Sequence, residues 1–255
     1  MMSKNKIVYL QWGDRYTQEH VDRLYDQINK NCSVDFDFMT VQGCHEGAAF
    51  DQMQSLQKKY YRGDLDVDSS ITENLSDTYV REDAGGLAHF RKFILFMRDD
   101  DDRYFDKDDT ILYVDLDTLI TNDLSYFFDL DNSKPWIARS WQFNKDSKWK
   151  RLYNLRSCPY FNSSVMVWKP GQCRKIFNQL TNPVKIEASF FQYGVNDNWL
   201  FHRFGPMAYS KDDRNFFNHF DKDIVVSDPS YMTNNTKIHT LAGLSMNEKN
   251  KICLN

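Results

Sequence analysis

The stretch Thr110–Leu124, T-I-L-Y-V-D-L-D-T-L-I-T-N-D-L, decides the fold of this 255-residue chain. Its first part, Ile111–Val114, is a short apolar run rich in β-branched and aromatic residues, which predicts a buried strand. Asp115 and Asp117 follow directly, and strand alternation would place both carboxylates on the same side. Two carboxylates at the end of a buried strand are costly to desolvate without a positive partner. The pattern therefore predicts a divalent-cation site that holds a phosphate ligand, at the sheet edge where open α/β folds bind their ligands.

The beginning of the chain predicts a parallel sheet. Ile7–Trp12 is an apolar run that indicates a first strand, and Gly13 follows it as a turn signal. Thr17 is placed to cap a helix, since apolar residues recur at helical spacing from there as far as Ile28. Val34–Val41 alternates and indicates a second strand. This order of strand, helix and strand is typical of an α/β fold with a parallel sheet.

The remaining chain adds further elements without a linker or repeat that would divide it. We therefore expect a single domain over residues 1–255, with two halves at 1–130 and 131–255. The polar stretch Arg62–Asp83 is expected to form a long loop. The other expected helices, turns and strands are Leu87–Met97, Leu124–Leu130, Trp136–Arg139, Tyr160–Trp168, Cys173–Leu180, Asp197–Phe204, Ile224–Val226 and Lys237–Thr240.

Composition limits the class of protein. A hydrophobic content of 41% and an aromatic content of 15% indicate a globular chain. The formal net charge of -4 gives no general attraction for nucleic acid. The apolar run Ile7–Leu10 is too short for a signal sequence or a membrane span. We therefore expect no transmembrane segment. The cysteine count is odd, no C-x-x-C occurs and no signal is recognised, so we expect reduced thiols and a cytoplasmic location.

Residues 113–120, Y-V-D-L-D-T-L-I, resemble the DxD motif of glycosyltransferases with the GT-A fold. The flanking pattern is similar to the glycogenin-like and lipo-oligosaccharide galactosyltransferase group. The resemblance implies a Rossmann-like, mostly parallel central sheet flanked by helices. It also implies metal-dependent transfer of a sugar from a nucleotide-sugar, a UDP-sugar, to an acceptor hydroxyl. The sugar, the acceptor, the stereochemical outcome and the oligomeric state stay open.

The resemblance assigns the donor nucleotide to the first half of the chain, residues 1–130, and the sugar and acceptor to the second half, residues 131–255. Tyr9–Tyr16, Y-L-Q-W-G-D-R-Y, would form a loop in which Gly13 allows close backbone approach and Tyr16 offers a flat face to uracil. Relatives carry a basic residue on the helix before the DxD strand, and Lys92 is the match here, with Arg91 as the fallback. The residues expected to contact the donor are Tyr9, Gln11, Gly13, Tyr16, Lys92, Asp115, Asp117, Ser163 and Gly243.

Two later segments match the part of the family that binds the sugar and acceptor. Phe161–Met166, F-N-S-S-V-M, resembles the family's F-N-[SA]-G-V strand, whose Asn and small residue line the donor-sugar pocket. Gly194–Trp199 resembles the acidic patch that faces the sugar and acceptor. Asn162 and Asp197 are therefore the expected catalytic residues, although Asn196 beside Asp197 could equally be a helix N-cap.

The last match is Ile238–Gly243, which resembles the family's late His-x-x-Gly segment. It implies that His239 completes the metal site formed by the two aspartates. Imidazole with two carboxylates suits Mn²⁺ better than Mg²⁺. Lys249 and Lys251 are the candidates for the lysine that follows in relatives. The tail around them is polar, so we expect it to be locally weak and to order over the diphosphate.

Two other classes of protein remain as alternatives. Phosphohydrolases of the haloacid-dehalogenase type also begin with an apolar strand and D-x-D, and Asp212–Asp213 could supply their late acidic pair. They require Thr two positions after the second Asp, where this chain has Leu119. A non-catalytic carbohydrate-binding module could use Trp141 and Trp149 as stacking platforms.

Overall fold

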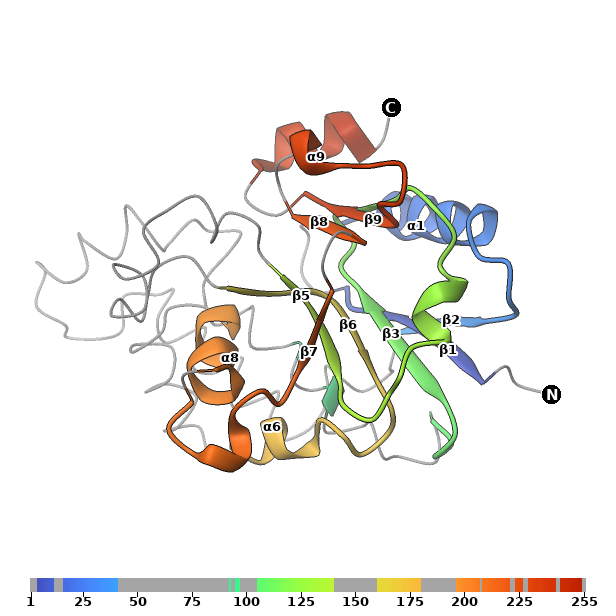
Figure 1. Ribbon diagram of the computed structural model, residues 1–255. Helices are drawn as coiled ribbons and strands as arrows, with labels where there is room; N and C mark the ends of the chain where they lie inside the picture. Colours follow the sequence, from blue (N-terminus) through green and yellow to red (C-terminus); the bar gives the residue numbers. More distant parts are fainter. Residues whose placement is uncertain are drawn as a thin grey trace, which may run out of the picture.

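The computed structural model describes residues 4–11, 16–40, 92, 95–96, 105–139, 160–179, 196–206, 208–220, 223–226, 229–241 and 244–253 (Figure 1). Several predicted features lie outside these residues. They include the loop expected at Arg62–Asp83, most of the helix expected at Leu87–Met97, the two glycines of the predicted donor loop and late segment, Gly13 and Gly243, and the two tryptophans Trp141 and Trp149. Among the described residues, no helix combines the length and apolar character needed to span a bilayer.

The main sheet has six strands in the order β2-β1-β3-β6-β5-β7. Neighbouring strands run parallel in β2-β1, β1-β3 and β5-β7, whereas β6 runs antiparallel to β3 and β5. The amino end of β6 therefore lies beside the carboxyl ends of β3 and β5. This confirms the expected mostly parallel sheet. The strands are β1 Asn5–Tyr9, β2 Asp37–Thr40, β3 Thr110–Val114, β5 Trp136–Arg139, β6 Phe161–Trp168 and β7 Asn218–Phe220.

A second, smaller sheet follows the DxD motif directly. Its order is β4-β9-β8, with β4 antiparallel to β9 and β8 parallel to β9. The strands are β4 Thr118–Ile120, β8 Ile224–Val226 and β9 Ile238–Thr240. Because β3 belongs to the main sheet and β4 to the small one, the aspartates between them lie where the chain passes from one sheet to the other.

Helices α1, α6 and α8 begin and end close to the expected positions, whereas η4, η5 and α9 were not expected. The first, α1, spans Gln18–Lys30, and the backbone N–H of Thr17 just before it donates to His20 Nδ1 at 3.2 Å. The chain turns at Pro170 and Gly171 after β6, and Gly171 adopts a φ of 85°, which favours glycine. The other helical elements are η2 Ser125–Phe128, α6 Arg174–Asn178, α8 Asn196–Phe204, η4 Lys211–Asp213, η5 Pro229–Tyr231 and α9 Met246–Cys253.

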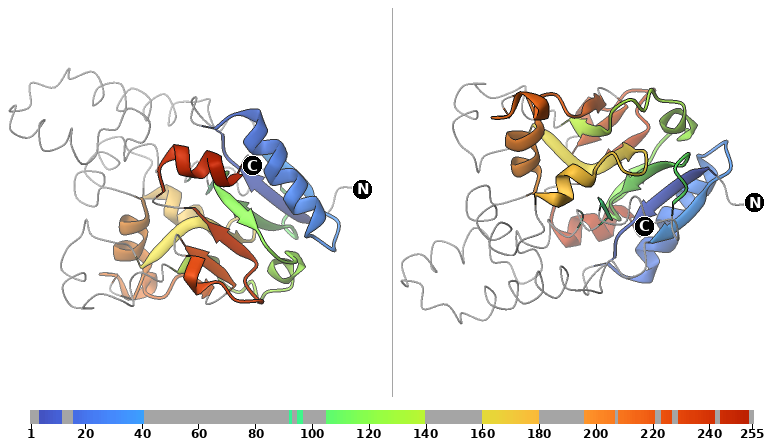
Figure 2. Two further views of the ribbon diagram at one scale, coloured as in Figure 1. Left: turned by 90° about the horizontal axis from the view of Figure 1, so that it is seen from above. Right: turned by 90° about the horizontal axis from the view of Figure 1, so that it is seen from below.

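The core lies on both faces of the main sheet, as alternation along β3 shows. Ile111 and Tyr113 pack in the cluster that contains Trp199 of α8. Leu112 and Val114 point the other way and pack with Leu24 and other residues of α1. Accordingly, α8 and α1 lie on opposite sides of the sheet (Figure 2). Every residue of β3 is buried, as the apolar run predicted.

Candidate active site

The two aspartates of the DxD motif lie in a turn. β3 ends at Val114, and the chain turns at Leu116 and Asp117 before β4 begins. The expectation that both carboxylates project from one extended strand is therefore wrong. The turn forms because the Thr118 hydroxyl donates to the backbone oxygen of Asp115 at 2.7 Å. The two side chains consequently have separate surroundings.

Helix α1 holds this turn from one side. The guanidinium group of Arg23 donates to the backbone oxygen of Thr118 at 2.7 Å and to that of Leu116 at 2.5 Å. From the small sheet, the backbone N–H of Leu241 donates to the backbone oxygen of Asp117 at 2.9 Å. These backbone contacts from α1 and from Leu241 hold the turn in place, so they also position its two carboxylates.

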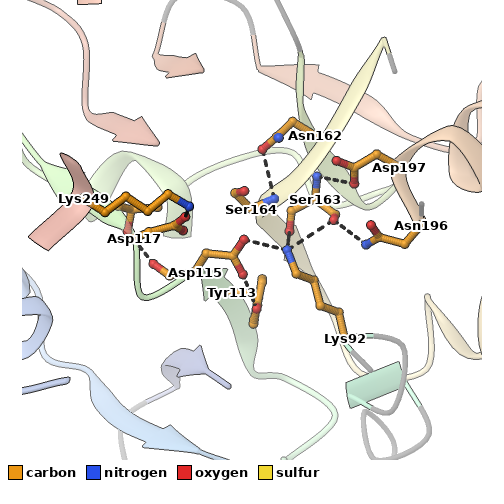
Figure 3. Close-up of polar contacts among 11 residues, drawn as sticks. Lys92, Tyr113, Asp115, Asp117, Asn162, Ser163, Ser164, Asn196, Asp197 and Lys249 are labelled. Atoms are coloured by element: carbon orange, nitrogen blue, oxygen red, sulfur yellow. Dashed lines mark hydrogen bonds and ion pairs between the residues drawn. The ribbon is translucent and has the colours of Figure 1, made fainter. Parts of the chain in front are cut away.

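Asp115 is bound by a lysine and a tyrosine. Lys92 Nζ lies 2.6 Å from Asp115 Oδ2, and the Tyr113 hydroxyl donates to Asp115 Oδ1 at 2.5 Å (Figure 3). Burial of Tyr113, followed by the negative charge of Asp115, raises the pKa of its phenol well above the ordinary value, so the hydroxyl stays protonated and remains a donor. Sequence reasoning missed Tyr113, although its position two residues before Asp115 on the same strand face was a usable signal.

The Asn162-Ser163-Ser164 segment belongs to a bulge in β6. Ile137 of β5 pairs with Met166, whereas the next residue, Ala138, pairs with Asn162. Residues 163–165 therefore have no partner on β5, and a bulge of this kind redirects side chains near a site. On the other side, the backbone N–H of Asp115 donates to the backbone oxygen of Ser164 at 2.9 Å. The bulge thus brings this segment against the first DxD aspartate.

Ser163 joins the bulge to α8. Its backbone N–H donates to Asp197 Oδ1 at 2.9 Å, and Asn196 Nδ2 donates to its hydroxyl at 2.7 Å. Lys92 Nζ also donates to the backbone oxygen of Ser163 at 3.4 Å. The predicted residues Lys92, Asp115, Ser163 and Asp197 are therefore brought together in one network (Figure 3).

The carboxyl group of Asp197 is surrounded by protein atoms, although the residue as a whole is partly exposed. This burial raises its pKa above the ordinary value, while the positive charge of Lys92 and the hydrogen bonding from Ser163 oppose the rise. An enclosed carboxyl group with a raised pKa beside a cationic side chain is a common feature of catalytic sites.

Asp117 has a different cation. Lys249 Nζ of α9 lies 2.5 Å from Asp117 Oδ2, and both side chains are buried. The neighbouring Asn250 Oδ1 lies 3.0 Å from His20 Nε2 of α1. The polar tail expected to be weak therefore forms a helix that is held by polar contacts. Of the two candidate lysines, Lys249 enters the site, whereas Lys251 is exposed.

His239, the third expected metal ligand, is buried on β9 opposite Leu119. Within the described part of the chain, no three His, Cys, Asp or Glu side chains converge as a metal site. Asp115 and Asp117 each face a lysine ammonium group instead. The three expected ligands therefore do not fit a metal ion in this arrangement.

The residues expected around the base lie at the end of β1. The Tyr9 ring stacks on Phe38 of β2, with ring centroids 4.7 Å apart. Gln11 Nε2 donates to the backbone oxygen of Tyr16 at 2.9 Å, which joins the segment after β1 to the segment before α1. Tyr16 is partly exposed and meets the edge of the His20 ring at 5.3 Å. Tyr16 therefore has an accessible surface, whereas one face of Tyr9 is occupied.

No protein-family model and no curated protein sequence matches the chain. Solved structures do match. A glycosyltransferase involved in glycosylation of the major capsid of PBCV-1 aligns over 98% of this chain and 98% of its own, with a TM-score of 0.50 and 8% identity. The chain has the GT-A glycosyltransferase fold.

Two further structures share the GT-A fold with this chain. An active-site mutant of LgtC aligns over 94% of this chain and 88% of its own, with a TM-score of 0.50 and 14% identity. The bifunctional glycosyltransferase WbbM aligns over 94% of this chain but only 46% of its own, with a TM-score of 0.51 and 12% identity. At these identities the likeness is one of fold.

Proposed function

We propose that this protein is a glycosyltransferase that moves a sugar from a nucleotide-sugar, a UDP-sugar, to an acceptor hydroxyl. The observation that carries the proposal is the polar network that joins Lys92, Asp115, Ser163 and Asp197 at the carboxyl end of β3. Open α/β sheets bind their ligands at this edge. The GT-A fold and the three glycosyltransferase neighbours support the same assignment.

In this proposal Lys92 binds the donor diphosphate. Its ammonium group is buried and already lies among oxygen acceptors, with Asp115 at 2.6 Å and the Ser163 backbone oxygen at 3.4 Å. Charge attraction is stronger in such an enclosed place than in water. Tyr113 and Lys92 together hold the Asp115 carboxylate in a single orientation. Tyr16, just before α1, offers the accessible part of its ring to the uracil.

Asn162, Ser163 and Asp197 are assigned to the sugar and acceptor side. The bulge in β6 presents the first two, and the start of α8 presents the third. Asp197 is the proposed proton acceptor for the attacking hydroxyl, because a raised pKa lies nearer to the working pH of general-base catalysis. Its hydrogen bond from Ser163 would hold the carboxylate in place during that transfer.

The family resemblance also implies Mn²⁺ or Mg²⁺ on Asp115, Asp117 and His239. The two aspartates can accept a divalent ion only after their lysine partners move. The roles proposed for Lys92, Asn162, Ser163 and Asp197 do not depend on that ion.

The two alternative functions gain no support from the structural neighbours, which are glycosyltransferases. A phosphohydrolase would need Asp115 as a nucleophile. Both of its carboxylate oxygens are engaged here, one by Lys92 and one by Tyr113. The proposal of sugar transfer is therefore preferred.

A thermal-shift panel of UDP, GDP, CDP and their sugars, with and without Mn²⁺, tests the donor class. Ligand binding to the folded state raises stability by about 2.7 kcal/mol at 100 times Kd, so UDP and one UDP-sugar should raise the melting temperature more than the other nucleotides. Release of UDP from that sugar should depend on Asp115, and Asp115→Asn should abolish it. Asp212→Asn, a change at an exposed aspartate, is the control. Phosphate release from a generic phosphoester, with no nucleotide-induced shift, would refute the proposal.

A further inference from the structure

Arg139, the last residue of β5, carries an enclosed polar atom without a partner. Its Nε is buried, and within the described part of the chain it has no hydrogen-bond partner. The guanidinium group lies over the ring of Tyr160, with its central carbon 4.5 Å from the ring centroid. None of the ion pairs among the described residues involves it. Because buried polar groups are nearly always paired in folded proteins, this arginine is a candidate for binding a ligand.

His219 of β7 lies beside Arg139 and carries a second atom of this kind. Its Nδ1 is also buried without a hydrogen-bond partner among the described residues. The His219 ring meets the Tyr160 ring edge-on, with centroids 5.6 Å apart. Burial, and then the positive charge of Arg139, lower the pKa of His219 to about 4, so the ring is neutral at pH 7. The positive charge of the pair therefore comes from Arg139.

The pair lies at the same edge of the main sheet as the DxD turn. β6 is antiparallel to both β3 and β5, so Arg139 ends its strand at the edge where Asp115 follows β3. Arg139 pairs with Phe161, the residue that precedes Asn162. Neighbouring strands are about 4.8 Å apart and β5 is two strands from β3, so Arg139 lies on the order of 10 Å across the sheet from the DxD strand. β6 therefore separates this pair from β3.

Arg139 also shares a face of the sheet with the proposed proton acceptor. Strand alternation puts Arg139 on the side of Ile137, which packs in the cluster that contains Phe201 of α8. The Tyr160 ring under the guanidinium group lies 5.7 Å from the Phe201 ring. Phe201 follows Asp197 by about one helical turn. The pair is therefore placed on the acceptor side of the proposed site.

We propose that Arg139 and His219 bind an anionic oxygen group, a carboxylate or a phosphate, on an acidic sugar acceptor. The planar guanidinium group matches such groups with two parallel charge-assisted hydrogen bonds. His219 would donate from Nδ1, since an ionised carboxylate only accepts hydrogen bonds. Both residues are partly exposed, so a change of rotamer can turn the enclosed atoms toward the ligand and pair them. The inference rests on the proposed function, because it names the class of acceptor for that reaction.

A panel of simple sugars tests the preference for charge. Glucuronate differs from glucose by a carboxylate, and glucose 6-phosphate differs from it by a phosphate. Titrations followed by ligand-observed NMR, with and without saturating UDP, give the three affinities. At least one charged sugar should bind about tenfold to 100-fold more tightly than glucose, as charge-assisted hydrogen bonds predict, and the tighter one identifies the anionic group. If neither charged sugar binds more tightly than glucose in either condition, the proposal is overturned.

Arg139→Gln should remove this preference, because it deletes the charge and keeps a polar side chain. Arg203→Gln, at an exposed arginine of α8, is the matched control and should leave the preference unchanged. Arg139→Lys keeps the charge without the planar fork, so it should retain only part of the preference. An unchanged preference in Arg139→Gln would contradict the assignment. Weaker UDP binding with unaltered binding of the charged sugars would assign Arg139 to the donor instead, and the proposal would fail.

His219→Phe separates ligand binding from packing. It keeps an aromatic ring against Tyr160 and removes the ring nitrogens without changing a charge at pH 7. Affinity for the preferred charged sugar should fall by about threefold to tenfold, as for one lost hydrogen bond. The melting temperature should stay equal or rise, because an unpaired buried atom is removed. A lower melting temperature with unchanged sugar affinity would assign His219 to the core and contradict its role in the subsite.

None of these titrations requires sugar transfer. A failed charge preference leaves the proposed transfer intact with a neutral acceptor. Failure of UDP-sugar turnover, in turn, leaves the measured affinities for the charged sugars unaffected. The two proposals are therefore tested separately.

Discussion

Asp197 and Ser163 are joined by a 2.9 Å hydrogen bond from the Ser163 backbone N–H to Asp197 Oδ1. This bond connects the first turn of α8 to the bulge in β6, although the two residues are 34 positions apart in the sequence. The carboxyl group that accepts it is enclosed, and burial raises its pKa. Burial, which is unfavourable for a charged carboxylate, is thus retained where the proposed chemistry requires one.

Asp197→Asn should keep the fold and lose the activity. The amide oxygen still accepts the hydrogen bond from Ser163, and the change removes an enclosed charge, so the melting temperature should be equal or higher. Sugar transfer should fall by about 100-fold or more, as expected when a general base is lost. The exposed residue Asp212 supplies the control, since Asp212→Asn should change neither quantity. A melting temperature several degrees lower would show that the carboxylate stabilises the fold.

Asp197 should also produce a measurable pH dependence of stability. Its pKa in the folded protein is raised above the unfolded value of about 3.9, so the folded state binds more protons over that interval. Its contribution to the free energy of unfolding therefore falls as pH rises through the folded pKa. In urea denaturation at a series of pH values, the stability advantage of Asp197→Asn should be small near pH 4 and should grow toward neutral pH. An advantage that shrinks with rising pH would contradict this sign.

Lys92→Gln should destabilise the protein, because it leaves the Asp115 carboxylate without its cation. Removing one partner of a buried ion pair costs about 3 kcal/mol. The double variant Lys92→Gln with Asp115→Asn should recover part of that loss, since no uncompensated charge remains. Chemical denaturation measures all three free energies, with exposed Lys107→Gln as the control. No recovery in the double variant would mean that Lys92 acts through packing rather than charge.

Tyr16→Ala should weaken the binding of UDP and uridine equally. Stacking acts on the base and is independent of the phosphates, so each ligand should lose about 1–3 kcal/mol of binding free energy. Tyr16→Phe keeps the ring and should bind normally. Calorimetry with Tyr25→Ala, which alters a 44% exposed tyrosine on α1, provides the comparison. Unaltered uridine affinity in Tyr16→Ala would assign the base to another place.

The sequence predicted the elements whose formation depends on a local pattern of residues. The buried run Ile111–Val114 became β3, and the strands expected at Trp136–Arg139 and Ile224–Val226 have the observed bounds. The direction of β6 was beyond prediction, because an apolar run has the same pattern in either direction. The conformation of the DxD turn was also missed, since it depends on Arg23, whose bond to Leu116 crosses 93 positions of the sequence.

Among the site residues, those in local motifs were predicted, whereas those that depend on distant contacts were not. Asp115, Ser163 and Asp197 were identified from their motifs and are joined through Lys92 and hydrogen bonds. Lys249 was only one of two candidates, because the sequence does not reveal which lysine of a helix faces a partner 132 positions away. The choice between the two lysines depends on how α9 packs near the turn between β3 and β4, and no local sequence pattern predicts that packing.

The bulge in β6 makes the length of this strand as important as its composition. Residues 163–165 have no partner on β5, and their number sets which faces the preceding residues Phe161 and Asn162 occupy. Deleting one of these residues would shift the preceding part of the strand by one position and move its side chains to the opposite faces. Apolar exchanges at Val165 or Val167 should therefore be tolerated, whereas a deletion scan should find that gaining or losing a single residue here abolishes donor binding. In a lineage of such proteins, insertions would be free to accumulate in the loops but not inside this strand.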